Sequence, residues 1–265
     1  MRKPQAASTR LQTLQSDHTP LLQFERFSGG DGIQHAVFTR KGGFSRGAFH
    51  SLNTSYGVGD RREAVRRNRQ KLQRILDAPA LVFVRQVHGT DVRIVSENNL
   101  SDFSRDEPPR ADALITSTKG ICLGIQVADC QPILLWDPSR EVVANVHSGW
   151  RGSVQNIVGR TVAVMQARFD CRPQEMIAAI GPSLGPCCSE FVHYRQEIPE
   201  RFWQYKDTAD HFDFWAITRD QLQAAGLDAK RIVSSELCTR CNTDRFFSYR
   251  GEGKTGRFAA VVGLR

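Results

Sequence analysis

The chain has 265 residues, of which 40% are hydrophobic and 24% charged, and its formal net charge is +8. This length allows one large domain or two small ones, and the composition is that of an ordinary globular protein. No apolar run approaches the roughly 20 residues that a membrane-spanning helix requires. Residues 1–23 also lack the apolar segment of a signal peptide. We therefore expect a cytoplasmic protein with no membrane partner.

The positive charge is scattered along the chain. Its one dense cluster, residues 60–74, has helical spacing and no interleaved aromatic residues. That pattern is typical of a solvated helix face, so we expect no nucleic-acid partner, whereas a small anion such as phosphate would suit the field. The seven cysteines cannot all pair with one another. Without an export signal they are expected to be reduced, and metal binding or catalysis ranks above disulfides.

Apolar alternation and helical periodicity divide the chain into short elements. Residues 1–20 are polar and aperiodic and are expected to form a loose tail, with residues 21–265 forming one domain. The elements expected in chain order are a strand at 33–40, a glycine-rich loop at 41–53, a helix at 61–76, strands at 80–88, 91–96, 111–117, 121–128, 132–137 and 141–147, a helix at 152–169, a strand at 176–182, a helix at 216–227, and strands at 231–236 and 257–265.

These elements show no regular alternation of strand and helix, so a doubly wound parallel sheet is not expected. The pattern favours an α+β fold, a single domain of layered mixed β-sheets flanked by helices.

Three potential metal ligands occupy the same kind of position, the end of a predicted strand beside small residues or a turn. His88 ends the strand at 80–88, Cys130 follows the strand at 121–128, and His147 ends the strand at 141–147. Separations of 42 and 17 residues mean that only the fold can bring them together. Two imidazoles and a thiolate would form a zinc site with an open position, as in catalytic zinc sites. Alternatively, Cys130 is a small buried hydrophobe and the histidines are scaffold.

Asp129 would point away from its neighbour Cys130 if both continue the strand, and it is expected to orient an adjacent group instead. A second cysteine pattern, Cys238 and Cys241 in CTRC, is a weak signal for structural zinc or a redox pair. The adjacent Cys187 and Cys188 could complete such a site. Neighbouring cysteines seldom both reach one ion, so we expect these four to be reduced cysteines in loops.

Three polar, glycine-bounded loops could hold a substrate. TRKGGFSRG offers Arg40, and HSGWRG offers Arg151 at the start of a predicted helix, where backbone N–H groups favour an anion. FFSYRGEGKTGR offers Phe247, Tyr249 and Arg250, a mixture suited to a base or sugar. Each loop could equally be a turn with surface arginines. The glycine-rich phosphate motifs GxGxxG and GxxxxGK[ST] are absent, which disfavours a nucleotide-hydrolysing enzyme.

Taken together, these segments resemble the YfiH family, which is also described as a laccase-domain, multicopper-polyphenol-oxidase-like or purine nucleoside phosphorylase family. The resemblance covers about residues 33–265 and is most specific in ADC-P followed by H-GWRG 17 residues later. Its other segments are TRKGGFSRGAFHSLNTSYGVGD, RQVHGTDV, ADALITS, IGPSLGPCC and CTRCNTDRFFSYRGEGKTGR. It implies a single α+β domain and a zinc site whose ligands and catalytic residues are His88, Cys130 and His147.

The resemblance further implies a zinc-dependent purine nucleoside phosphorylase of broad specificity, acting with phosphate on adenosine, inosine, guanosine and methylthioadenosine, with additional adenosine deaminase activity. Substrate contacts are expected from Arg40, Arg151, Phe247 and Arg250. Gly251 replaces the second arginine that is usual in the family, which leaves the preferred nucleoside open.

Three alternatives remain. A copper polyphenol oxidase is disfavoured, because laccase-type centres use many histidines in His-x-His pairs and this chain has seven histidines and no such pair. A peptidoglycan-precursor editing hydrolase would use Cys130 as nucleophile with His88 or His147 as base. A scaffold protein would keep the site as a relic. The oligomeric state and the general acid or base are not predicted.

Overall fold

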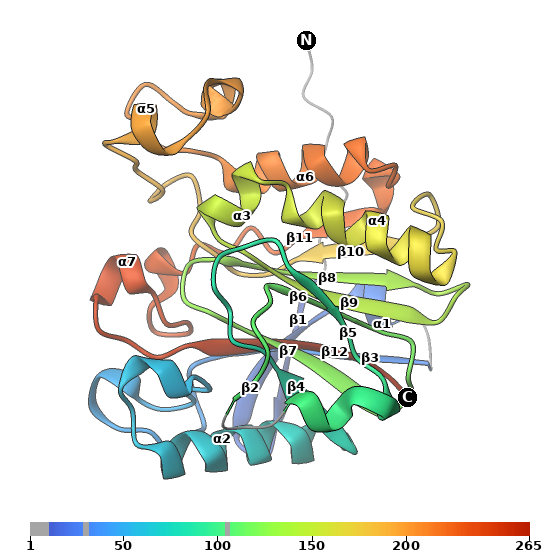
Figure 1. Cartoon of the computed structure of the whole chain (residues 1–265). Helices are drawn as coiled ribbons and strands as arrows, with labels where there is room; N and C mark the ends of the chain where they lie inside the picture. Colours follow the sequence, from blue (N-terminus) through green and yellow to red (C-terminus); the bar gives the residue numbers. More distant parts are fainter. Residues whose placement is uncertain (1–10, 29–31, 104–106) are drawn as a thin grey trace.

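Two stacked six-stranded sheets form the centre of the computed structural model, which describes residues 11–28, 32–103 and 107–265 (Figure 1). Both sheets are mixed, with parallel pairing between β4 and β7, between β5 and β6 and between β10 and β11. The first sheet runs in the order β1 (Leu11–Ser16), β2 (Thr19–Phe24), β3 (Ile33–Phe38), β12 (Phe258–Leu264), β7 (Ile121–Val127) and β4 (Ala80–Phe83). The second runs in the order β11 (Ile232–Ser234), β10 (Ile177–Ile180), β8 (Gln131–Asp137), β9 (Val142–Ser148), β6 (Ala113–Thr116) and β5 (Val92–Ile94).

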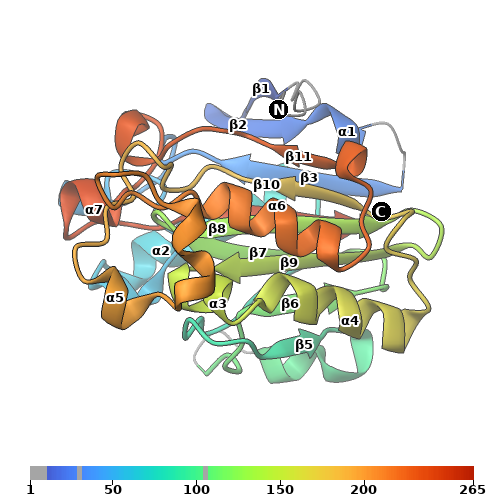
Figure 2. The same cartoon turned by 90° about the horizontal axis from the view of Figure 1, so that it is seen from above.

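Helices cover the outer face of each sheet and complete four layers. Helix α2 (Arg62–Ile75) packs on the first sheet, and α4 (Ile157–Phe169) and α6 (Phe214–Ala224) lie over the second (Figures 1 and 2). Shorter helices are α1 (Glu25–Ser28), α3 (Trp150–Val154), α5 (Tyr194–Glu197) and α7 (Tyr249–Glu252). None of the helices in the described ranges has both the length and the apolar character needed to cross a bilayer.

The space between the sheets is apolar, with Ile125 of the first sheet and Leu134 of the second among its residues. The polar side chain of Asn145 crosses it. The Asn145 amide donates to the carbonyls of Leu123 and Ala260, at 2.8 and 2.9 Å. Because a buried amide is costly unless it is hydrogen-bonded, these two bonds fix β9 against the first sheet. Asn145 lies two residues before His147, so the tie also holds the functional end of β9.

The predicted α+β fold with layered mixed sheets is confirmed, but the expected loose tail needs correction. Residues 11–20 form β1 and the start of β2, while residues 1–10 lie outside the described residues. The two strands are joined by Asp17 and His18, which both have positive φ, as a tight two-residue hairpin turn requires. Because β1 is largely exposed, its sequence lacks the alternation that would reveal a strand.

The helix expected over residues 152–169 is divided into α3 and α4. Asn156 adopts a left-handed conformation with φ of 57°, and its side chain accepts a bond from the Gly159 N–H, which caps α4. The apolar spacing continues across this break and conceals it. The strand expected over residues 80–88 is also shorter, because β4 ends at Phe83. His88 therefore lies in a loop, with φ of 59°.

A candidate metal-binding active site

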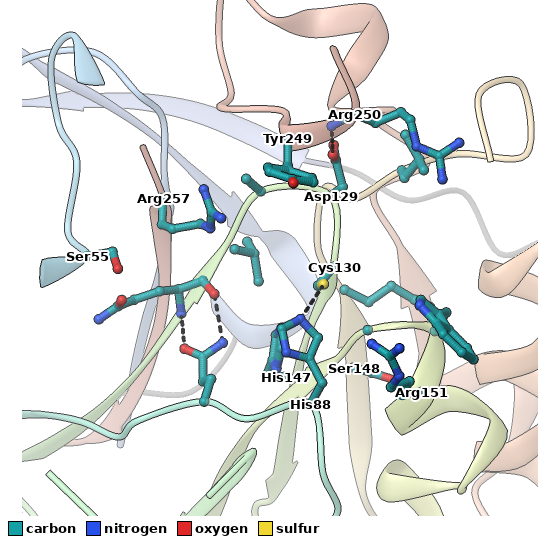
Figure 3. Close-up of a pocket in the computed structure, with 18 of the residues that line it drawn as sticks. Ser55, His88, Asp129, Cys130, His147, Ser148, Arg151, Tyr249, Arg250 and Arg257 are labelled. Carbon is teal, nitrogen blue, oxygen red and sulfur yellow. Dashed lines mark hydrogen bonds between the residues drawn. The ribbon is translucent and has the colours of Figure 1, made fainter. Parts of the chain in front are cut away.

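A cavity of about 1340 Å³ opens at the end of the sheets where the loops after β4 and β7 meet the end of β9. Its wall also includes residues of α3, of the 189–193 segment and of α7. His88, Cys130 and His147 all line this cavity (Figure 3). The fold therefore gathers the three residues that the sequence singled out.

These three residues, hereafter the triad, present their donor atoms to one point. One nitrogen of each histidine and the Cys130 sulfur lie within 4.8 Å of one another, and His88 Nε2 is 3.8 Å from Cys130 Sγ. The two imidazole rings meet edge to face, with centroids 4.9 Å apart. Cys130 sits in the turn between β7 and β8, and His147 lies on the neighbouring strand β9, so strand pairing sets their approach.

A buried carboxylate, Asp112, fixes two of the triad residues. Its Oδ1 is 2.8 Å from His147 Nδ1, and the backbone N–H groups of Val87, His88 and Gly89 donate to the same carboxylate. Bonding at Nδ1 leaves Nε2 of His147 for a ligand, as carboxylates do for histidines that bind metals. The carboxylate also sets the position of the loop that carries His88.

The electrostatics of the triad favour a thiolate. Burial alone would raise the pKa of the Cys130 thiol, but the charge of His147 and hydrogen bonds from both histidines outweigh it and lower the pKa to about 6. Burial would lower the pKa of His147, but the Cys130 thiolate and the bond to Asp112 raise it to about 9. A thiolate is the form that binds metals. Two imidazoles and one thiolate therefore fit a borderline-soft ion such as Zn²⁺, with its open side toward the cavity.

Asp129, beside Cys130, orients neighbouring groups, as the sequence suggests. It has a positive φ of 86°, and its carboxylate accepts bonds from the Thr239 hydroxyl at 2.6 Å, the Ser248 hydroxyl at 2.7 Å and the Arg250 N–H at 2.6 Å (Figure 3). The turn that carries Cys130 is thereby tied to the loop before α7 and to α7 itself.

The four expected substrate residues separate into two groups. Arg151 and Arg250 line the cavity. Arg40 and Phe247 are not part of its wall: Phe247 is fully buried, and the Arg40 guanidinium stacks on its ring at 4.4 Å and pairs with Glu252 at 2.7 Å. Arg40 and Phe247 therefore support the loops that carry them from outside the cavity wall. Helix α3, where Arg151 lies, has five residues, so its dipole is smaller than that of the long helix expected there.

Comparison with known proteins identifies the family. Residues 34–265 match the family described as multi-copper polyphenol oxidoreductase laccase. The chain belongs to this family. Two members with solved structures carry the names YfiH and YlmD, and we refer to it as the YfiH family.

Relatives and solved structures agree along nearly the whole chain. The purine nucleoside phosphorylase YlmD of Geobacillus stearothermophilus is 36% identical over 249 residues, which cover 88% of this chain and 91% of that protein. A purine nucleoside phosphorylase of Bacteroides thetaiotaomicron is 33% identical over 257 residues, 91% of this chain and 95% of that protein. The crystal structure of YfiH from Bacillus licheniformis superposes with a TM-score of 0.85 at 30% identity, covering 92% of this chain and 96% of that chain. The crystal structure of YlmD gives 0.83 at 34% identity, with 96% and 98% covered.

Two residues of the site in this YfiH-family chain were not predicted from the sequence, Asp112 and Arg257. Asp112 stands just before an apolar strand, where an acidic residue usually marks a loop, and only its full burial shows its role. Arg257 lines the cavity, as does Tyr249, which the sequence did suggest. The positive charge of Arg257 beside a glycine-rich loop was the available signal, and it could not select this arginine over its neighbours.

Proposed function

We propose that this protein is a zinc-dependent purine nucleoside phosphorylase, with the triad as its metal site. The observation that carries the proposal is a soft metal-binding triad opening into a cavity lined by arginine and aromatic side chains. Relatives named purine nucleoside phosphorylase at 30–36% identity support it. The triad and the cavity wall together offer places for an anion and for a planar base.

Two arginines are suited to bind phosphate. Arg257 is largely buried, donates to the carbonyls of Thr255 and Gly256, and forms no salt bridge within the described residues. Arg151 stacks on Trp150 at 4.5 Å and likewise has no ion pair within the described ranges. In the view of Figure 3 they flank the triad on opposite sides. Guanidinium groups without carboxylate partners at a cavity wall favour an oxyanion ligand.

Aromatic side chains in the same wall are suited to the purine and sugar. Tyr249 is 62% exposed, which is unusual for a large ring, and it lines the cavity together with Trp150, Phe191 and Phe214. An exposed ring face beside a cavity favours stacking with a planar base. The cavity is larger than most small-ligand pockets, which supports tolerance for adenosine, inosine, guanosine and methylthioadenosine.

In phosphorolysis a phosphate oxygen bonds to C1′ of the sugar while the bond from C1′ to the purine nitrogen breaks, and that electron pair leaves with the base. Zinc held by the triad would supply Lewis-acid positive charge at this position. Arg151 and Arg257 hold the phosphate, and their charges are already in place when the transition state forms. We extend the proposal to adenosine deamination at the same site.

The direct test incubates the purified protein with inosine and with adenosine, in the presence and absence of phosphate. We expect free purine and ribose 1-phosphate only when phosphate is present, and inosine from adenosine without it. Ribose 1-phosphate distinguishes phosphorolysis from hydrolysis. If neither nucleoside is consumed under any condition, the proposal is wrong.

Replacing the phosphate-binding arginines should affect phosphate more than nucleoside. For Arg257→Met and Arg151→Met we expect the KM for phosphate to rise about 10- to 100-fold, since a charge-assisted hydrogen bond contributes roughly 1.5–3 kcal/mol. The KM for inosine should change little. Arg168→Met is the matched control, because Arg168 is exposed on α4 and is not part of the cavity wall. Equal effects on both substrates would argue against phosphate binding by these residues.

The family description favours one further candidate, a copper oxidase. Two groups of His, Cys, Asp or Glu in the described residues could hold an ion, and only the triad contains histidine. Laccase-type centres hold several coppers on many histidines, so this donor set supports zinc better. Stoichiometric copper in protein purified without added metal would favour the oxidase. Full activity in metal-free protein would instead favour a hydrolase with Cys130 as nucleophile.

A further inference from the structure

Four cysteines outside the cavity wall form a second compact group: Cys187, Cys188, Cys238 and Cys241. Their sulfurs lie within 4.8 Å of one another, and the Cys241 sulfur is 3.6 Å from the sulfurs of both Cys187 and Cys188. In a tetrahedral site with Zn–S bonds of about 2.3 Å, neighbouring sulfurs lie about 3.8 Å apart. The group therefore has the dimensions of a four-thiolate metal site.

A turn allows the adjacent cysteines to share this position. Residues 186–188 form a turn, closed by a 2.9 Å hydrogen bond from the Cys188 N–H to the Gly185 carbonyl. Adjacent cysteines seldom both reach one ion, but this turn places the Cys187 and Cys188 sulfurs at the same distance, 3.6 Å, from the Cys241 sulfur. The four cysteines lie in loops, as expected, and the turn lets the adjacent pair share one site.

The two cysteine-bearing segments are held together independently of the sulfurs. The Ser183 N–H donates to the Leu237 carbonyl at 3.2 Å, and the Thr239 N–H donates to the Ser183 carbonyl at 3.0 Å. A Cβ on Gly185 would lie 2.8 Å from the Trp215 ring and 3.1 Å from Cys238 Cβ, so only glycine permits this approach. The site is therefore preorganised by the backbone.

Backbone groups also face the Cys238 sulfur: the N–H groups of Gly185 and Cys241 donate to it. The N–H of Cys241 thus bonds the sulfur three residues earlier, inside the CxxC segment.

A disulfide accounts for this arrangement less well than a metal does. A disulfide joins two sulfurs at about 2.05 Å, so Cys241 could pair with Cys187 or with Cys188 but not with both. Cys241 is equally distant from these two sulfurs, and Cys238 completes the group. One ion can bind all four.

We propose that Cys187, Cys188, Cys238 and Cys241 bind a structural zinc ion, distinct from the triad. Closed Cys₄ coordination leaves no position for substrate, so the ion acts by holding loops. Both segments contact Asp129: the Thr239 hydroxyl donates to its carboxylate at 2.6 Å, and the Leu184 N–H donates to its carbonyl at 2.8 Å. Since Asp129 precedes Cys130, the ion clamps the turn that positions the triad thiolate.

The test is elemental analysis of protein purified without added metal. We expect about two zinc ions per chain in the wild type and about one in Cys241→Ser and in Cys238→Ser. Cys130→Ser should also retain about one, and Cys130→Ser combined with Cys241→Ser should retain none. Cys171→Ser is the matched control: Cys171 is also buried, and its thiol bonds to Asp137, a bond that serine can keep. It should match the wild type.

Two results separate this inference from the proposed function. A single zinc that persists in Cys130→Ser and is lost in Cys241→Ser would support the four-cysteine site while contradicting the triad site. A zinc content unchanged by Cys241→Ser, or disulfides among these cysteines by mass spectrometry without reduction, would overturn the inference. If Cys238→Ser and Cys241→Ser do not fold, the four-cysteine site is tested instead by exchanging its metal for cobalt in the Cys130→Ser protein. Intense thiolate-to-cobalt charge-transfer bands are then expected, and their absence would contradict the site.

Discussion

Cys130→Ser is expected to abolish phosphate-dependent cleavage of inosine, with a loss of about 10³-fold or more in kcat/KM. The thiolate is the only sulfur donor of the triad, and a serine hydroxyl remains protonated at neutral pH, so the site loses its ion. A bound metal contributes several kcal/mol of charge stabilisation, and each 1.4 kcal/mol is about tenfold in rate. Steady-state kinetics with inosine and phosphate measure this directly.

Cys171→Ser provides the control for Cys130→Ser, since it replaces a buried thiol remote from the cavity wall. It should retain wild-type activity. The fold should survive both changes, because Cys130 lies in a turn and only partly contributes to the core. If Cys130→Ser keeps wild-type kcat/KM, the triad is not the catalytic centre.

The second large effect is expected from Asp112→Asn. The ionised carboxylate acts only as an acceptor. It accepts hydrogen bonds from the backbone N–H groups of Val87, His88 and Gly89 and from the His147 Nδ1–H. An amide would place its own N–H₂ against one of these donors and would no longer fix the His147 tautomer. Replacing such a partner of a metal ligand typically costs 10- to 100-fold in metal affinity. Chelator competition measures that affinity.

Asp112→Asn should also lower the free energy of unfolding by about 3 kcal/mol, because it breaks a buried, multiply bonded carboxylate. Asp137→Asn is the matched control: Asp137 is equally buried and accepts N–H groups of Ser139, Arg140 and Arg172, away from the triad. It should lose stability without losing metal affinity. Equal metal affinity in the two variants would show that Asp112 supports the fold alone.

The triad could be predicted only in part from residue positions. Cys130 and His147 adjoin strand ends, as expected, whereas His88 lies in a loop five residues beyond β4, and the resemblance to the YfiH family was needed to favour the three residues together. Asp112 could not be predicted, since its role depends on four donors that only the fold gathers. The fold class followed from the irregular order of strands and helices.

Local geometry accounts for most of the remaining errors. The apolar spacing across residues 152–169 continues through Asn156, whose left-handed conformation has no periodic signal. Arg40 and Phe247 lie in loops of the expected type and pack on each other outside the cavity wall. Cys187 and Cys188 were expected not to share one ion because they are adjacent, whereas the turn at residues 186–188 brings both sulfurs near Cys241.

Metal depletion tests whether zinc at the triad drives the reaction: the release of hypoxanthine from inosine is followed in metal-depleted protein, with phosphate, before and after zinc is restored. We expect almost no release from the depleted protein, recovery when zinc is added to the wild type, and no recovery in Cys130→Ser. Full phosphate-dependent activity in the depleted wild-type protein would contradict this expectation.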